Sequence, residues 1–110
     1  MITQEPHQVG ALHEVSLTGT WFPIDVLGQP VLLTFPGSDA LYLPCFRSLA
    51  QLHEAMAGMA YAAIQEVVDE GQFFSSLRAY PSIRVVLDLR KTAENRFRYL
   101  LVQDPRTPTT

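Results

Sequence analysis

The alternation of apolar and polar residues is clearest in the last third of the chain. Apolar side chains recur at every second position from residue 83 to 90, and again from residue 96 to 102 after a polar loop. This period is typical of strands, so the pattern predicts an antiparallel hairpin. Its predicted core face carries Ile83, Val85, Leu87, Phe97, Tyr99 and Leu101, and its opposite face carries Arg84, Arg90, Arg96 and Arg98.

Two shorter apolar runs predict an earlier hairpin. Residues 31–35 (VLLTF) and 40–46 (ALYLPCF) are β-type runs, and residues 36–39 (PGSD) between them favour a turn. Pro44 has no N–H to donate, so the second strand either ends there or holds Pro44 at a sheet edge. Residues 14–24 are β-branched and aromatic but contain Gly19 and Pro23, which predicts an edge strand or an irregular segment.

A first helix is predicted after these runs. Ser48 stands three residues before Gln51, which is the spacing of a capping box. Apolar residues then recur at helical intervals on one side, and the helix is expected to end near Gly58. They are Leu49, Leu52, Met56 and Met59.

A strand and a second helix are predicted next. Residues 61–68 (YAAIQEVV) favour a strand, and Asp69 with Gln72 repeats the capping-box spacing. Pro81 is expected to terminate this short helix. The side predicted to face the core carries Phe73, Leu77 and Tyr80.

The order of these elements predicts an α+β fold, with two helices packed on a mostly antiparallel sheet. The chain has 110 residues, enough for one domain. We expect a loosely ordered arm at residues 1–13, the domain at residues 14–103 and a flexible tail at residues 104–110.

Three short motifs resemble the N-terminal domain of the enhanced-serine-sensitivity (SseB-like) family over about residues 31–102. They are Leu43-Pro44-Cys45-Phe46-Arg47-Ser48, Asp69-Glu70-Gly71-Gln72-Phe73 and Val86-Leu87-Asp88. The chain departs from the family pattern by the inserted Glu70 and by Leu89 in place of a proline. The resemblance implies an α+β module without a known catalytic apparatus, found in small bacterial proteins, some near secretion or toxin systems.

Charge is divided unevenly along the chain, although the net charge is only −3. Residues 1–77 hold one base against eight acids, a net −7, and residues 78–110 hold seven bases against three acids, a net +4. Two explanations stay open: the basic end pairs with the acidic end inside the fold, or it faces an acidic partner. A negative chain is a poor nucleic-acid binder, so no nucleic acid is expected.

Composition limits the setting of the protein. The longest uncharged stretch, residues 26–38, is far shorter than the roughly 20 apolar residues of a membrane helix, so no membrane partner is expected. Cys45 is the one cysteine, and the first residues lack an apolar run of the signal-peptide type. A cytoplasmic location is therefore predicted.

Candidate catalytic groups are few. Cys45 and His53 are the one thiol and imidazole close in sequence, and with Tyr42 they could line a pocket of a small-molecule binder or a minor enzyme. The alternative is that Cys45 is a buried small side chain and His53 is solvated. No H-x-x-x-H or C-x-x-C spacing occurs, so neither a metal nor a cofactor is expected.

The arginines of the last hairpin are the leading candidate site, because guanidinium groups suit carboxylates and are common at interfaces. Arg84, Arg90, Arg96 and Arg98 are predicted to bind another protein with an acidic surface. Alternatively, Arg84 pairs with Glu94, or Arg90 with groups near Asp88. Trp21 and Phe22 form a second candidate contact, or else cover the core. Contact between copies of the chain through edge strands such as residues 31–35 is compatible with either function.

Overall fold

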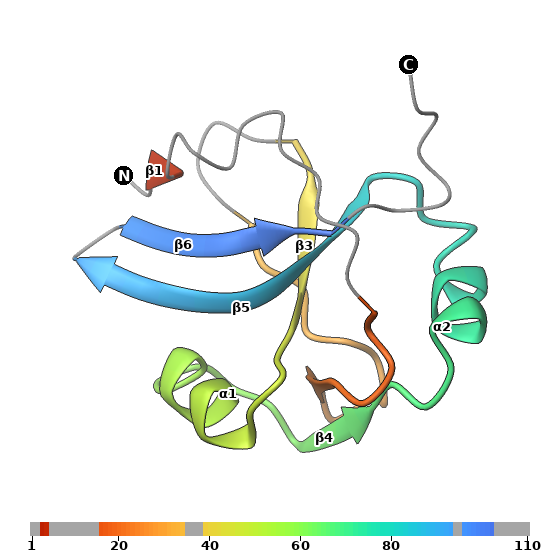
Figure 1. The fold of residues 1–110 in the computed structure, drawn as a ribbon, viewed down its shortest axis with the longest axis horizontal. Coiled ribbons are helices and arrows are strands. Elements are labelled where there is room, and N and C mark those ends of the chain that lie inside the picture. Colours follow the sequence, from red (N-terminus) through yellow and green to blue (C-terminus); the bar gives the residue numbers. More distant parts are fainter. Residues whose placement is uncertain (1–2, 5–15, 35–38, 94–95, 103–110) are drawn as a thin grey trace.

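The structure, a computed structural model, describes residues 3–4, 16–34, 39–93 and 96–102 (Figure 1). Its elements are, in chain order, β1 (Thr3–Gln4), β2 (Trp21–Ile24), β3 (Leu41–Cys45), α1 (Leu49–Ala55), β4 (Ala63–Glu66), α2 (Glu70–Ser76), β5 (Ile83–Ala93) and β6 (Arg96–Leu101). The rest of the predicted arm and the predicted tail lie outside the described residues. Neither helix is long and apolar enough to cross a bilayer in these ranges.

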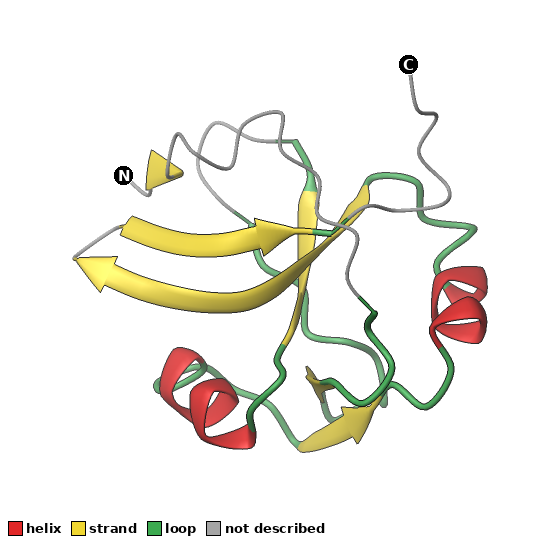
Figure 2. Ribbon diagram, viewed as in Figure 1, coloured by secondary structure: helices red, strands yellow, loops and turns green. Residues whose placement is uncertain are grey.

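The described residues form two sheets and two helices. The larger sheet has the strand order β1-β6-β5-β3, with β5 and β6 antiparallel and with parallel pairing of β1 to β6 and of β3 to β5. The smaller sheet pairs β2 with β4 in antiparallel fashion. Figure 2 shows the two helices on separate sides of these strands. The predicted α+β class is confirmed.

The first predicted hairpin is reduced to a single bridge. Leu33 and Tyr42 exchange backbone hydrogen bonds of 2.8 Å in each direction, but residues 31–34 form no strand. The predicted turn lies mostly in residues 35–38, outside the described part. β3 instead pairs with β5, from Leu41 opposite Ile83 to its last residue. The sequence predicted an edge strand at residues 31–35, through which copies of the chain could contact each other. This prediction is wrong for residues 31–34, the part that the structure describes.

Pro44 occupies the outer edge of β3, which was one of its two predicted positions. Tyr42 and Phe46, two residues to either side, turn their backbone groups away from β5 and bond to Leu33 and Trp21. Successive residues of a strand alternate in this respect, so Pro44 also turns outward and its missing N–H interrupts no ladder.

β5 is buried on both faces, although the alternation predicts one buried face. It lies inside the larger sheet, between two hydrophobic clusters. The first cluster contains Ile83, Val85 and Leu87 with Phe74 and Leu77 from the region of α2. The second contains Val86 and Leu89 with Leu52 and Met56 from the region of α1. Val86 is thus fully buried on the face predicted to be polar, because α1 covers it.

The predicted start of α1 is confirmed. The Ser48 hydroxyl accepts a hydrogen bond from Gln51 N–H at 3.4 Å, which satisfies one of the unpaired N–H groups at the helix start. The predicted apolar side is only half right, because Leu52 and Met56 are fully buried while Leu49 and Met59 are 42% and 39% exposed.

α2 also begins as predicted. Asp69 Oδ1 accepts from Gly71 N–H at 2.8 Å and from Gln72 N–H at 3.3 Å. The predicted core side is partly wrong. Phe74 and Leu77 are buried, whereas Tyr80 is 56% exposed because the helix has already ended at Ser76, before Pro81 can terminate it.

Candidate functional site

A β-bulge at Asp88 interrupts the alternation of β5. The register moves from Leu87 opposite Leu100 to Arg90 opposite Arg98, so two residues of β5 stand against one residue of β6. Asp88 has φ 57°, a left-handed conformation that Asp tolerates better than most residues. The bulge reverses the facing of the side chains that follow it as far as Lys91, where the register shifts again. Leu89 therefore joins the cluster that contains Val86.

Asp88 holds the bulge to the β3–α1 connection. The Arg47 backbone N–H donates to Asp88 Oδ1 at 3.1 Å, and Arg47 Nε donates to Oδ2 at 2.7 Å. The Arg47 guanidinium also forms an ion pair with this carboxylate. From α1, Gln51 Nε2 donates to the Asp88 carbonyl oxygen at 3.2 Å. Both helix capping and bulge formation thus depend on the same short connection.

This ion pair uses a base of the acidic part of the chain and an acid of the basic part, so the remaining charge is divided more unevenly. Arg47 is the single base of residues 1–77, and Asp88 is one of three acids in residues 78–110. Among the described residues it is the one ion pair, so the bases of the C-terminal third gain no acidic partner there. Pairing of the basic end with the acidic end is therefore not seen within these ranges, and Glu94, a predicted partner of Arg84, lies outside them.

The four arginines do not share one face. Arg84 precedes the bulge, lies opposite Tyr42 in the sheet register and shares its face with Val86. Its Nη1 donates to the Pro81 carbonyl oxygen at 2.8 Å. The half-buried side chain therefore binds the backbone just before the start of its own strand. Arg90 follows the bulge and lies on the other face. The prediction of one arginine face fails because the bulge shifts the alternation by one residue.

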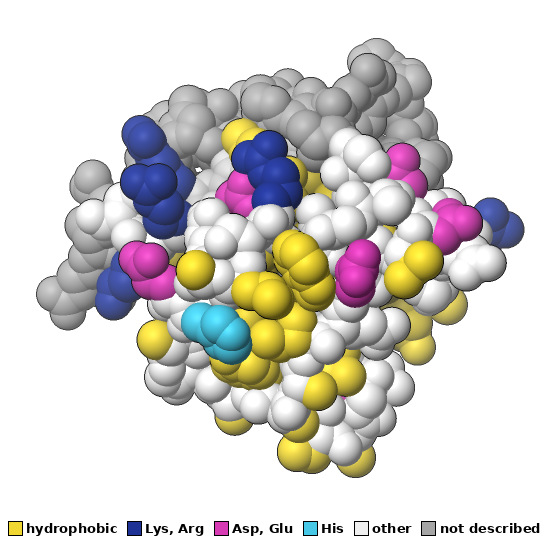
Figure 3. Space-filling view, turned by 60° about the horizontal axis from the view of Figure 1, so that its bottom comes forward, with side chains coloured by type: hydrophobic (Ala, Val, Ile, Leu, Met, Phe, Trp, Pro, Cys, Tyr) yellow, Lys and Arg dark blue, Asp and Glu magenta, His cyan; other side chains and the backbone are white. Residues whose placement is uncertain are grey.

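Arg90 and Arg98 form the exposed part of the predicted site. They lie directly opposite each other across β5 and β6, and neither forms an ion pair with a described residue. Lys91, also exposed, follows Arg90 at the end of the hairpin. The backbone of Arg96 starts β6, but its side chain lies outside the described part. Figure 3 shows basic side chains gathered on the side of the molecule where β5 and β6 project.

A groove of about 400 Å³ adjoins these bases, between α1 and β5. Arg90 and Lys91 line one side, and Gln51 and Glu54 of α1 line the other. Ala50 and Ala55 give it apolar lining, while Leu89 lies fully buried beneath it. Lys91 shares the α1 face of β5, whereas the Arg90 side chain lies on the other face with Arg98. The groove therefore offers one cation beside a recess, which suits an acidic side chain with an apolar neighbour.

Trp21 and Phe22 divide between surface and core. Phe22 is 5% exposed and lies in the first cluster, where its ring centroid is 5.4 Å from that of Phe73. It offers almost no contact area to a partner, as expected if it covers the core. Trp21 is half-buried against the second cluster. In β2 the two side chains face opposite clusters, because neighbouring residues of a strand alternate.

Cys45 is fully buried at the end of β3. The pKa of its thiol is raised from 9.0 to about 12, mainly by burial. A hydrogen bond with Thr20 lowers this pKa, and the charge of Asp88 raises it. A nucleophilic cysteine needs the opposite, a lowered pKa and exposure. The thiol is therefore a poor nucleophile in the folded protein.

His53 lies on α1 and is exposed, as expected for a solvated side chain. Its Nδ1 is 2.9 Å from the Tyr61 hydroxyl oxygen, and the two rings have centroids 6.5 Å apart. Neither His53 nor Cys45 lines the groove between α1 and β5. Across the described ranges, no group of three or more His, Cys, Asp or Glu side chains could hold a metal ion.

Comparisons with known proteins add no relative. No protein-family model, curated protein or solved structure matches the chain. The resemblance to the SseB-like family therefore stays a prediction from its three motifs.

Proposed function

We propose that this protein is a non-catalytic interaction module, which binds an acidic surface of another protein through Arg90, Lys91 and Arg98. The supporting observation is the opposition of Arg90 and Arg98 across the hairpin, exposed and without an ion pair to any described residue. Like charges directly opposite each other destabilise a sheet slightly. An acidic group of a partner would offset this repulsion by attracting both guanidinium groups.

The groove between α1 and β5 adds a position for a partner side chain. Arg90 and Lys91 border it, and Ala50 and Ala55 give it apolar lining. Guanidinium and carboxylate groups form paired hydrogen bonds, and charged groups at an interface mainly accelerate association and select the partner. We expect a partner segment with Asp or Glu residues next to an apolar side chain.

The resemblance to the SseB-like family supplies the biological setting of this proposal. It implies a module of small bacterial proteins, some of them near secretion or toxin systems, and the cysteine usage adds the expectation of a cytoplasmic location. The buried Cys45 gives no support to the alternative of a small-molecule site or a minor enzyme near Cys45 and His53.

The test is affinity capture from a lysate of the native host with three forms of the full chain: wild type, Arg98→Glu and Arg78→Glu. Arg78 is also exposed and lies beyond α2, so its reversal makes the same change in net charge away from the hairpin. We expect Arg98→Glu to weaken capture of a stoichiometric partner about fivefold, the equivalent of roughly 1 kcal/mol for an exposed charge.

Salt dependence provides the second readout. Capture by wild type should weaken as salt rises from low to physiological concentration, since exposed charges are screened. An equal loss in Arg98→Glu and Arg78→Glu would indicate a general charge effect and remove the assignment to the hairpin. Capture that neither variant alters would remove it as well.

A further inference from the structure

The outer edge of β4 carries backbone groups that β2 does not use. Trp21 of β2 exchanges both its backbone hydrogen bonds with Phe46, at 2.8 Å each way, although Glu66 is its register partner in β4. The N–H of Val67 donates to Thr20 O at 2.8 Å. In an antiparallel ladder such a bond flanks a non-hydrogen-bonded pair, which here is Trp21 and Glu66. The N–H and C=O of Glu66 therefore point away from β2.

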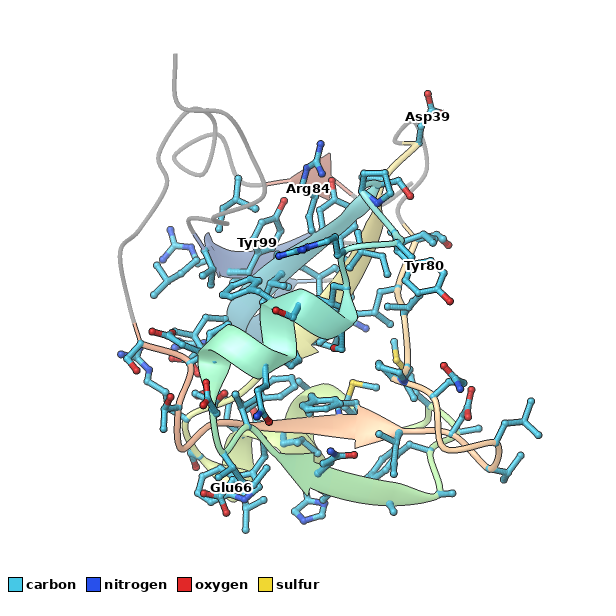
Figure 4. The ribbon with its side chains drawn as sticks, turned by 90° about the vertical axis from the view of Figure 1, so that its right-hand side faces the viewer. Asp39, Glu66, Tyr80, Arg84 and Tyr99 are labelled. Atoms are coloured by element: carbon cyan, nitrogen blue, oxygen red, sulfur yellow. The ribbon has the colours of Figure 1, made fainter. Side chains whose placement is uncertain are left out.

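The same geometry holds two residues earlier. Pro23 has no N–H, and its carbonyl oxygen accepts from Val31 N–H at 2.9 Å, so its register partner Ile64 also turns its backbone groups outward. Outside the β2–β4 ladder no described residue forms a backbone hydrogen bond to Ile64 or Glu66, and the register turns these groups away from β2. In Figures 1 and 4 β4 follows the margin of the molecule, with Glu66 labelled at its end in Figure 4. One short strand edge is thus open to a further strand.

A groove of about 360 Å³ lies beside this edge, between β4 and α2. Phe22 and Phe73 contribute aromatic rings to it, and Asp69 is its acidic side chain. Glu66 borders the groove, but its side chain shares the face of its register partner Trp21, opposite to that of Phe22. Asp69 caps α2 through Oδ1. An apolar stem that ends in a positive charge, as in lysine or arginine, is complementary to this lining.

We propose that the outer edge of β4 binds an extended segment of a partner protein as an added strand, with a lysine or arginine of that segment in the groove between β4 and α2. In this mode of binding, backbone hydrogen bonds supply affinity and alternate side chains supply specificity. Ile64 and Glu66 offer the backbone donors and acceptors. This surface is separate from the basic hairpin and has the opposite charge, so it does not depend on the proposed function.

The first experiment follows the backbone amides of the isotope-labelled full chain by NMR during titration with the peptide acetyl-Thr-Val-Lys-Val-Lys-Val-Thr-amide. The matched control peptide has Glu in place of both Lys residues. We expect the Lys peptide to shift the Ile64 and Glu66 amides and to slow their hydrogen exchange about tenfold, since exchange requires the added strand to leave. The Glu peptide should do neither.

The second experiment separates the backbone bond from the charge. Asp69→Asn removes the carboxylate of the groove and keeps a helix N-cap, and Glu66→Pro removes the outward N–H. Glu66→Gln keeps the N–H and is the control for the lost Glu66 charge. The outward N–H carries no ladder bond, so Glu66→Pro should keep the fold, which its amide spectrum will show. We expect binding of the Lys peptide to weaken about threefold in Asp69→Asn and about tenfold or more in Glu66→Pro, and to change by less than about twofold in Glu66→Gln.

Three outcomes would overturn the proposal. The first is equal binding of the Lys and Glu peptides, and the second is no change at the Ile64 and Glu66 amides. The third is protection of these amides without peptide that grows with protein concentration, which would assign the edge to a second copy of the chain. If Glu66→Pro does not fold, the exchange measurement on wild type decides the question. The Arg98→Glu variant should bind the Lys peptide as wild type does.

Discussion

At the residue scale, Asp88 has the widest influence on the candidate site. Its left-handed φ of 57° allows the bulge in β5, and its carboxylate accepts hydrogen bonds from the Arg47 backbone and side chain. The bulge places Leu89 in the core and Arg90 on the face of Arg98. A single aspartate thus decides which of the predicted arginines lie together.

Substitutions of Asp88 separate its role in the left-handed backbone of the bulge from the hydrogen bonds of its carboxylate. We expect Asp88→Gly to lower the free energy of unfolding by about 2 kcal/mol, through loss of the charge-assisted hydrogen bonds. Asp88→Ala should lower it by about 1 kcal/mol more, because alanine is strained at a positive φ. Denaturant unfolding of both variants measures the difference. Equal stability of the two would show that the backbone at this position relaxes without the aspartate.

At the element scale, β5 shows how a strand's surroundings override its pattern. Alternation along residues 83–90 predicts one core face, and the structure covers the other face with α1. Parallel pairing with β3 makes β5 an inner strand of its sheet. Inner strands with helices on both faces are buried throughout, and polar residues remain only where the strand leaves the core.

A buried and an exposed valine allow the burial of both faces of β5 to be tested. Val86 is fully buried in β5, while Val68, after β4, is 76% exposed. Threonine has nearly the shape of valine but brings a hydroxyl, so Val86→Thr should lower the free energy of unfolding by about 1–2 kcal/mol. Val68→Thr should change it by less than about 0.5 kcal/mol. Thermal unfolding of the pair checks this, and similar losses in both would contradict the two-sided core.

At the scale of the whole molecule, two hydrophobic clusters share β5 and so depend on one another. Cys45 lies in the first cluster and Tyr99 in the second. Burial raises the pKa of both groups to about 12, from 9.0 for the thiol and from 10.0 for the phenol, and Tyr42 adds to the effect at Tyr99. Their ionisation is therefore coupled to unfolding of the molecule.

Stability should fall at alkaline pH as a result. Above pH 9 the unfolded chain loses the thiol proton, whereas the folded protein keeps it up to about pH 12. The folded state then binds more protons, so the free energy of unfolding falls as pH rises, by about 1.4 kcal/mol per pH unit for each group. Between pH 9 and 10 the slope belongs mainly to Cys45, and Cys45→Val should remove it in denaturant titrations. An unchanged slope in that variant would locate the effect elsewhere.

Much of the fold could be predicted from local pattern. The hairpin of β5 and β6, both helix starts at Ser48 and Asp69, and the strand at β4 follow from residues close together in sequence. The candidate site was predicted less well. Arg90 and Arg98 do lie together, but Arg84 lies apart, and no local signal marks Asp88 as the residue that changes the facing.

The sequence by itself determined the element types, their caps and the uneven charge, because these depend on neighbours within a few residues or on composition alone. The tertiary structure decided three further properties: the parallel partner of β3, the burial of both faces of β5, and the open edge of β4. Each of these depends on which distant segment supplies hydrogen bonds or covers a face. Distant segments meet only when the whole chain packs, so the periodicity of one strand cannot specify them.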